Sequence, residues 1–160
     1  MSSTIELELR PVRRDDLPVF FAHQLDPVAN HVAAFVADDP ADRGAFDARW
    51  ERLLSDDTVT SRTVVHDGEV VGHVASYVSD VGREVTYWID RDHWGKGLAT
   101  ETLRSFLEII TARPLHARTA SDNLGSLRVL ERCGFEVARV ETAYAPGRRA
   151  QIDETLLVLR

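Results

Sequence analysis

The chain of 160 residues is poor in cysteine, methionine and lysine, with one residue of each type. The single cysteine, Cys133, cannot form an internal disulfide, which suits a reducing compartment, and we expect the protein in the cytoplasm. No apolar run approaches the roughly 20 residues that span a bilayer, so no membrane association is expected. The first residues lack a basic region followed by an apolar stretch, which argues against a secretory signal.

Positive charge is also scarce, and the formal net charge is −7. This balance argues against nonspecific nucleic-acid binding, which relies on Lys and Arg to neutralise phosphates. Residues 1–60 carry 12 acidic and 6 basic side chains, whereas residues 61–160 carry 14 and 13. The acidic first part is either a solvated face or an attraction for a cationic substrate. No metal is expected.

The hydrophobic fraction of 44% and the length predict one folded domain over residues 1–160. Helices are predicted at 13–25, 26–35, 41–54, 95–111 and 122–133. Strands are predicted at 5–9, 58–66, 70–78, 84–90, 114–119, 135–144 and 151–159. This order predicts an α+β fold with a mixed central sheet flanked by helices.

The most informative stretch is residues 87–100, which is typical of a strand, a loop and the first turn of a helix. Free N–H groups and the helix dipole at such a junction favour a phosphate or pyrophosphate. Gly95 and Gly97 lack a Cβ, so the anion can approach the main chain closely. Lys96 lies between them and adds positive charge.

Two common phosphate motifs do not fit this loop. A P-loop needs a glycine, four residues and then Gly-Lys-Ser/Thr, a spacing that Gly95-Lys96-Gly97 lacks. A dinucleotide fingerprint needs a third glycine or alanine where this chain has Thr100, and it follows a first parallel strand.

A different family fits better. Three parts of the chain resemble signatures of the GNAT superfamily of N-acetyltransferases. They are residues 87–89 with 94–101, residues 123–126 with 130–135, and the terminal residues 144–159, which include the acidic pair Asp153-Glu154. Within it, the chain resembles the branch of the ribosomal-protein-alanine acetyltransferases. The resemblance covers nearly the whole chain and implies a mostly antiparallel sheet that is splayed at the cofactor strand. One departure is Asp92, where the superfamily usually has Gln or Arg, so its side chain should point away.

The resemblance implies acetyl-CoA as co-substrate, with its pyrophosphate against the N–H groups of residues 94–100. Its pantetheine arm should run between strands 84–90 and 114–119, and Arg128 or Arg132 could approach the nucleotide phosphates. The implied cofactor-binding residues are Trp88, Ile89, Trp94, Gly95, Lys96, Gly97, Leu98, Ala99, Thr100, Asn123 and Ser126.

The implied reaction is acetyl transfer to a primary amine by direct attack, the amine belonging to a protein N-terminus, a peptide or a small molecule. Glu84 is the expected general base, with His73 in reserve, because the amine must lose a proton. A strand N–H near Ile89 or Asp90 is the expected donor to the carbonyl oxygen.

Two residues could protonate the departing thiolate. Ser126 matches a serine that the branch can use, and Tyr144 is a second candidate acid. Because superfamily members form no acyl-enzyme, Cys133 is interpreted as a small helix residue rather than a nucleophile.

An alternative function is a non-catalytic acyl-CoA-binding sensor or scaffold, which the loop would serve equally well. Arg148 and Arg149 in the final turn could bind an acidic group on the acceptor. The resemblance to the family further implies that the protein could form a homodimer.

Overall fold

The computed structural model describes residues 5–160; most of the segment that bears on a secretory signal lies outside this range. The strands are β1 Leu7–Arg10, β2 Thr60–His66, β3 Glu69–Ser79, β4 Gly82–Ile89, β5 Leu115–Ala120, β6 Glu136–Ala145 and β7 Ala150–Leu159. The α-helices are α1 Leu17–His23, α2 Pro27–Ala33, α3 Arg43–Ser55, α4 Leu98–Ile109 and α5 Leu124–Arg132. None of the described helices is long and apolar enough to cross a membrane.

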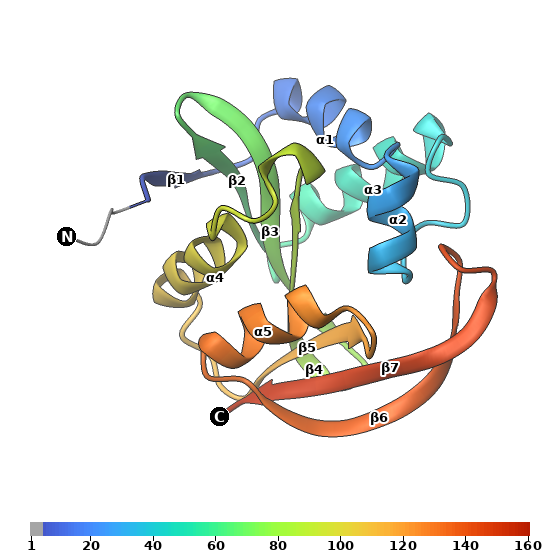
Figure 1. Ribbon diagram of the computed structural model, residues 1–160. Coiled ribbons are helices and arrows are strands. Elements are labelled where there is room, and N and C mark those ends of the chain that lie inside the picture. Colours follow the sequence, from blue (N-terminus) through green and yellow to red (C-terminus); the bar gives the residue numbers. More distant parts are fainter. Residues whose placement is uncertain (1–4) are drawn as a thin grey trace.

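The strands form one open sheet in the order β1-β2-β3-β4-β5-β7-β6 (Figure 1). Every neighbouring pair is antiparallel except β4 and β5, which are parallel. These two strands pair at a single register position, Glu84 with His116. The predicted α+β fold with a mostly antiparallel, splayed sheet is confirmed.

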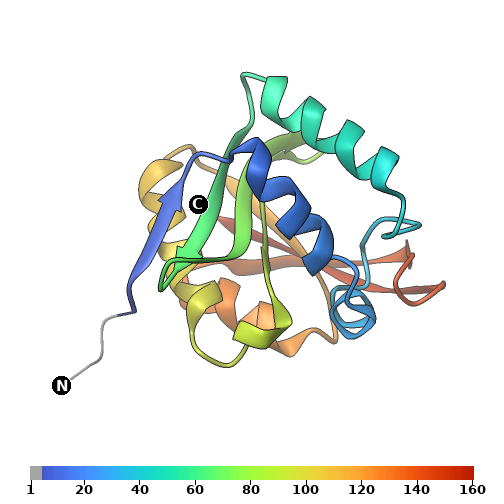
Figure 2. The same ribbon diagram turned by 90° about the horizontal axis from the view of Figure 1, so that it is seen from above.

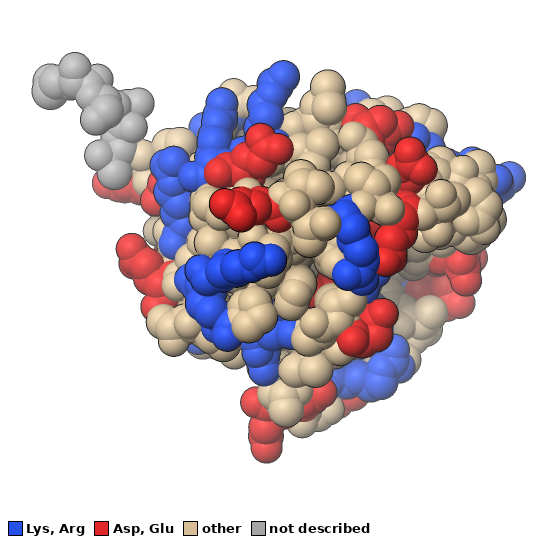
Figure 3. All heavy atoms as spheres, turned by 90° about the horizontal axis from the view of Figure 1, so that it is seen from below, with Lys and Arg blue, Asp and Glu red and all other residues tan. Residues whose placement is uncertain are grey.

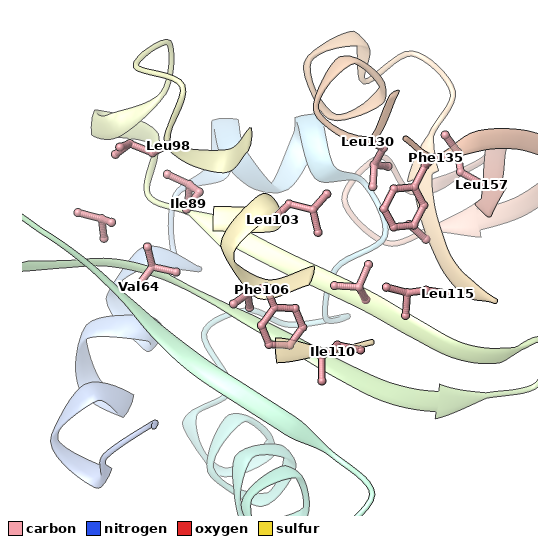
Figure 4. Close-up of a cluster of buried hydrophobic side chains, with 14 residues drawn as sticks. Val64, Ile89, Leu98, Leu103, Phe106, Ile110, Leu115, Leu130, Phe135 and Leu157 are labelled. Atoms are coloured by element: carbon pink, nitrogen blue, oxygen red, sulfur yellow. The ribbon is translucent and has the colours of Figure 1, made fainter. Parts of the chain in front are cut away.

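Helices cover both faces of the sheet, with α4 and α5 on one side and α3 on the other (Figures 1 and 2). The main core lies under α4 and α5 (Figure 4). Leu98, Leu103 and Phe106 form the buried stripe of α4, as their spacing predicts. On the other face, Phe20 of α1 packs on Trp50 of α3, with their ring centroids 5.2 Å apart.

All five predicted helices begin later than expected, and α1 and α4 show the largest differences. Residues 14–16 form a short 3-10 turn before α1. The predicted start of α4 at Gly95 is wrong, because Gly95 and Gly97 have φ values of 77° and 78° and the helix begins at Leu98. A left-handed residue cannot belong to a right-handed helix, so the loop extends to Gly97.

The turn before α1 is held by a buried carboxylate. Asp16 accepts hydrogen bonds from both terminal nitrogens of Arg10 at 2.7 and 2.8 Å, from the Arg13 amide at 2.8 Å and from the Thr63 hydroxyl at 2.7 Å. Burial raises the pKa of Asp16, but the Arg10, Arg13 and Thr63 donors together lower it to about 2. Asp16 therefore ties the start of α1 to β1 and β2.

We expect Asp16→Asn to reduce the free energy of unfolding by about 2 kcal/mol at pH 7. The folded-state pKa lies below the ordinary value of 3.8, so the contribution is complete above about pH 4 and is lost as the pH falls towards 2. Urea unfolding at a series of pH values should show this acid-sensitive component in the native protein and not in the variant. Equal pH dependence of the two proteins would contradict it.

Candidate active site

A cleft of about 640 Å³ opens where β4 and β5 part. It is lined by β4 from Val85 to Ile89, by the start of α4, by α5 and by residues of α2. The two helices α4 and α5 point their N-terminal ends at this gap (Figure 1). The first N–H groups of a helix have no partner within it, so the start of α4 offers free donors to the cleft.

The main chain of β4 also offers free groups to the cleft. The Asp90 amide donates to the Val71 carbonyl of β3 at 2.8 Å. Because bonding direction alternates along a strand, the amides of Ile89 and Tyr87 face β5 instead, where pairing has ended. The prediction that the Asp90 N–H could donate to the carbonyl oxygen of the thioester is wrong, because this N–H donates to Val71. The main chain of Trp88 likewise faces β3, so this residue lines the cleft without free main-chain groups.

The loop before α4 lines one end of the cleft through Gly95 and Gly97. Leu98, Ala99 and Thr100 open the helix, and its first turn closes with the Glu101 amide on the Gly97 carbonyl at 3.2 Å. The amides of Leu98, Ala99 and Thr100 are therefore free of intrahelical bonds. Lys96 is exposed and is not among the lining residues.

Trp94 contributes differently from what the sequence predicts. Its amide donates to the Arg91 carbonyl at 3.0 Å, and its indole N–H donates to the Ile89 carbonyl at 2.8 Å. Both N–H groups are thus used within the protein, and Trp94 braces the loop against β4. Asp92 is exposed and lies outside the cleft, as expected from its charge.

The beginning of α5 faces this loop across the cleft. Asn123 caps the helix, its side-chain oxygen accepting from the Ser126 amide at 3.2 Å, so its NH₂ remains a donor for a ligand. Arg128 and Arg132 line the same cleft. On the face seen in Figure 3, Lys and Arg side chains are interspersed with Asp and Glu, so this face carries no uniform acidic patch.

Ser126 is hydrogen-bonded to Tyr87, with 2.9 Å between the two hydroxyl oxygens, and both residues line the cleft. Burial raises the pKa of Tyr87 to about 12, although the Ser126 hydrogen bond opposes it. The phenol is therefore protonated at neutral pH. The sequence analysis did not identify Tyr87 as a site residue. Its spacing of two residues from both Val85 and Ile89 places the three side chains on the same face of β4 and could have indicated it. Tyr144 is 53% exposed and is not among the lining residues.

Glu84 is buried and held by an ion pair. Its carboxylate lies 3.2 Å from Nε of Arg118, which also contacts Asp80 at 2.9 Å and Glu154 at 3.7 Å. Arg118 lines the cleft, whereas Glu84 does not. Burial raises the pKa of Glu154, and Arg118 counteracts it. The sequence did not predict this three-carboxylate network around one arginine.

The remaining candidates lie away from the cleft. His73 packs between Phe20 and Trp50, at centroid distances of 4.7 and 5.1 Å, and burial lowers its pKa to about 3. Cys133 is half-buried with its Sγ 3.8 Å from the Thr100 carbonyl, and burial raises the pKa of its thiol. Arg148 is engaged by Asp122 in a bidentate contact at 2.8 and 2.9 Å.

The open sheet with a cleft at its splayed parallel pair has the architecture of a GNAT acyltransferase. The sequence matches the acetyltransferase (GNAT) domain family over residues 6–136. The chain belongs to this family, which confirms the predicted family and enzyme class. No curated protein sequence matches the chain.

Solved structures agree on the fold. RimJ of Mycobacterium smegmatis, in complex with a CoA disulfide, has a TM-score of 0.79 and 21% identity, covering 96% of this chain and 81% of RimJ. RimL, a ribosomal alpha-N-protein acetyltransferase in complex with coenzyme A, has a TM-score of 0.79 and 17% identity, covering 98% and 94%. The microcin C7 self-immunity acetyltransferase MccE, in complex with acetyl-CoA and AMP, has a TM-score of 0.78 and 14% identity, covering 96% and 92%. The predicted acetyl-CoA co-substrate agrees with these ligands.

Proposed function

We propose that the whole chain acts as one acetyltransferase domain that transfers the acetyl group of acetyl-CoA to a primary amine by direct attack. The observation that carries this proposal is the gap between β4 and β5, where unpaired strand amides face the free amides of α4. An acyl chain with amide groups can bind along such a strand edge as an added strand does.

The donor would be held by its phosphates and along its pantetheine arm. Its diphosphate would lie against the amides of residues 95–100, with Arg128 and Arg132 available for the nucleotide phosphates. Its pantetheine arm would accept from the Ile89 amide and meet the NH₂ of Asn123. This arrangement brings the thioester to Tyr87, the next β4 residue whose amide is free.

At that point the amine nitrogen would attack the thioester carbonyl carbon with its lone pair. The carbonyl oxygen gains charge and accepts from the Tyr87 amide, a donor fixed in place by the sheet. The C–N bond forms, the C–S bond breaks, and the sulfur leaves with the electron pair. The amine nitrogen must lose a proton and the thiolate must gain one, which requires a base and an acid.

Glu84 is the base in this proposal, acting through water. Strand alternation places its side chain on the same face of β4 as Thr86 and Trp88, which line the cleft. Arg118 holds the carboxylate and itself reaches the cleft. A water chain beside Arg118 would carry the proton from the amine to Glu84.

Ser126 and Tyr87 together are the acid. Their shared hydrogen bond of 2.9 Å allows either hydroxyl to donate to the thiolate while the other restores its proton. The exposed position of Tyr144 keeps it outside this pair.

We expect Tyr87→Phe to lower kcat about tenfold, because the ring remains while the phenolic proton is lost. The Kd for CoA should stay within about twofold, since the Tyr87 main chain is unchanged. Tyr144→Phe is the comparison, as it removes the same hydroxyl from the other candidate acid, and its kcat should equal that of the native protein. A loss confined to Tyr144→Phe would reverse the assignment.

The proposed function is tested by measuring thiol release from acetyl-CoA with a panel of primary amines, alongside CoA binding by calorimetry. Amine-dependent thiol release supports acetyl transfer. Tight CoA binding without turnover on any amine would instead favour the sensor or scaffold.

A further inference from the structure

A second cavity, of about 100 Å³, adjoins the cleft on the other side of β4. The two share Phe35, Val36 and the β4 residues Thr86, Tyr87 and Trp88 in their walls. It therefore opens where the proposed mechanism brings the thioester, and we call it the acceptor cavity. An engineered apolar cavity of ~150 Å³ can hold benzene, so this one suits a compact group.

The walls of the acceptor cavity are largely aromatic. Phe20, Trp50 and Trp88 come from α1, α3 and β4, and the His73 ring packs on the first two at 4.7 and 5.1 Å. A group that enters this space loses contact with water on most sides. Each polar atom of the wall then needs a partner from the ligand.

Three such atoms have none within the described residues. They are Oδ1 of Asn30, Nδ1 of His73 and Nε1 of Trp88, all buried and all from residues that line the acceptor cavity. The Asn30 amide nitrogen donates to the Gln24 carbonyl at 2.8 Å, which leaves its oxygen as an acceptor. The Trp88 indole can only donate. A ligand that satisfies these atoms therefore needs both an N–H donor and an oxygen acceptor.

The charge of the residues that line the acceptor cavity further limits the class of ligand that can bind. Among the described residues that line the acceptor cavity, Arg49 is the only permanently charged one, and none is a carboxylate. No ion pair joins Arg49 to another residue of the described chain 5–160. A ligand with several ammonium groups would be repelled by Arg49 and would have no carboxylate of these residues to pair with. A ligand carboxylate could pair with Arg49 and accept a hydrogen bond from the Trp88 N–H.

We propose that the acceptor is an amino-acid-like compound, a compact apolar monoamine that carries a carboxylate, rather than a polyamine. This inference rests on the proposed acetyl transfer. The amine would lie beside Thr86–Trp88 with Asn30 as acceptor, and the carboxylate would lie towards Arg49. The acidic bias of residues 1–60 does not extend to this cavity, so it does not select for a cationic substrate there.

The test compares acetylation of the twenty amino acids, their amides, their decarboxylated amines and spermidine. For at least one apolar amino acid, we expect kcat/KM to exceed that of its amide and its amine tenfold or more. In Arg49→Gln, kcat/KM for the amino acid should come within about threefold of kcat/KM for its amide, mainly because KM for the amino acid rises. The control is Arg52→Gln, which removes the same charge from the same helix outside the cavity, and it should keep the native ratio.

A binding measurement separates this inference from the proposed function. Trp50 and Trp88 line the cavity, so the preferred amino acid should quench tryptophan fluorescence of the CoA-saturated protein, and Arg49→Gln should raise its Kd about tenfold or more. Preference for spermidine or neutral amines, or no acetylation of any amino acid, overturns the inference, as does a native ratio in Arg49→Gln. Acetyl transfer itself stands whenever any amine releases thiol from acetyl-CoA.

Discussion

Gly97→Val should weaken CoA binding about 30-fold, which corresponds to roughly 2 kcal/mol. Gly97 has a φ of 78°, a conformation that a β-branched residue adopts only under strain. A Cβ at this position would also lie 3.2 Å from the Ile5 side chain. The loop would turn to relieve the strain and carry the amides of the α4 start away from the diphosphate. Isothermal calorimetry with CoA measures the change.

The matched control for this substitution is Gly68→Val. Gly68 lies in the turn between β2 and β3 with a φ of 77°, and a Cβ added there would meet no atom of the described residues within 4 Å. This variant should lose conformational stability through the same backbone strain but keep its native CoA affinity. Native affinity in Gly97→Val, or equal weakening in both variants, would remove the diphosphate from the start of α4.

Glu84→Gln should lower kcat about 100-fold or more at pH 7, with CoA affinity nearly intact. The amide keeps the size of the carboxylate and cannot accept the proton. The defect should shrink above pH 8, because an α-amine with an ordinary pKa of roughly 7.7–8.0 loses its proton to the solvent there. Stopped-flow or steady-state thiol release across pH 6–9 measures both effects.

Asp80→Asn is the control for Glu84→Gln, because it also removes one carboxylate from Arg118. Asp80 is exposed, with 82% of its side chain accessible, whereas the Glu84 side chain is 4% accessible. A general effect on Arg118 would reduce kcat in both variants. A specific base role predicts a loss in Glu84→Gln alone, and an unchanged kcat in that variant would exclude Glu84 from proton transfer.

The left-handed loop, the buried face of α4 and the cap of α5 could be predicted because local sequence determines them. Gly95 and Gly97 fix a left-handed loop, and the apolar spacing of α4 fixes which face is buried. Asn123 is a capping residue by type and position. These features depend on neighbours within a few residues, where propensity and capping chemistry apply directly.

The rest of the site depends on contacts between distant parts of the chain. The Tyr87–Ser126 pair joins residues 39 positions apart, and Glu84–Arg118 joins residues 34 apart. The engaged amides of Trp94 and Asp90 follow from a turn and from the β3 register, which periodicity alone does not give. The acceptor cavity is built from α1, α2, α3, β3 and β4, and no short motif encodes it.

The single ladder position that β4 and β5 share leaves an opening in the sheet where the two strands part. The coenzyme and the amine would approach from opposite sides, so neither would block the entrance of the other. The cleft is lined by β4, α4, α5 and a few residues of α2, whereas the acceptor cavity is lined mainly by the first 50 residues. New substrate preferences could therefore evolve in α1 and α3, which line only the acceptor cavity, without disturbing the residues that present the acetyl group.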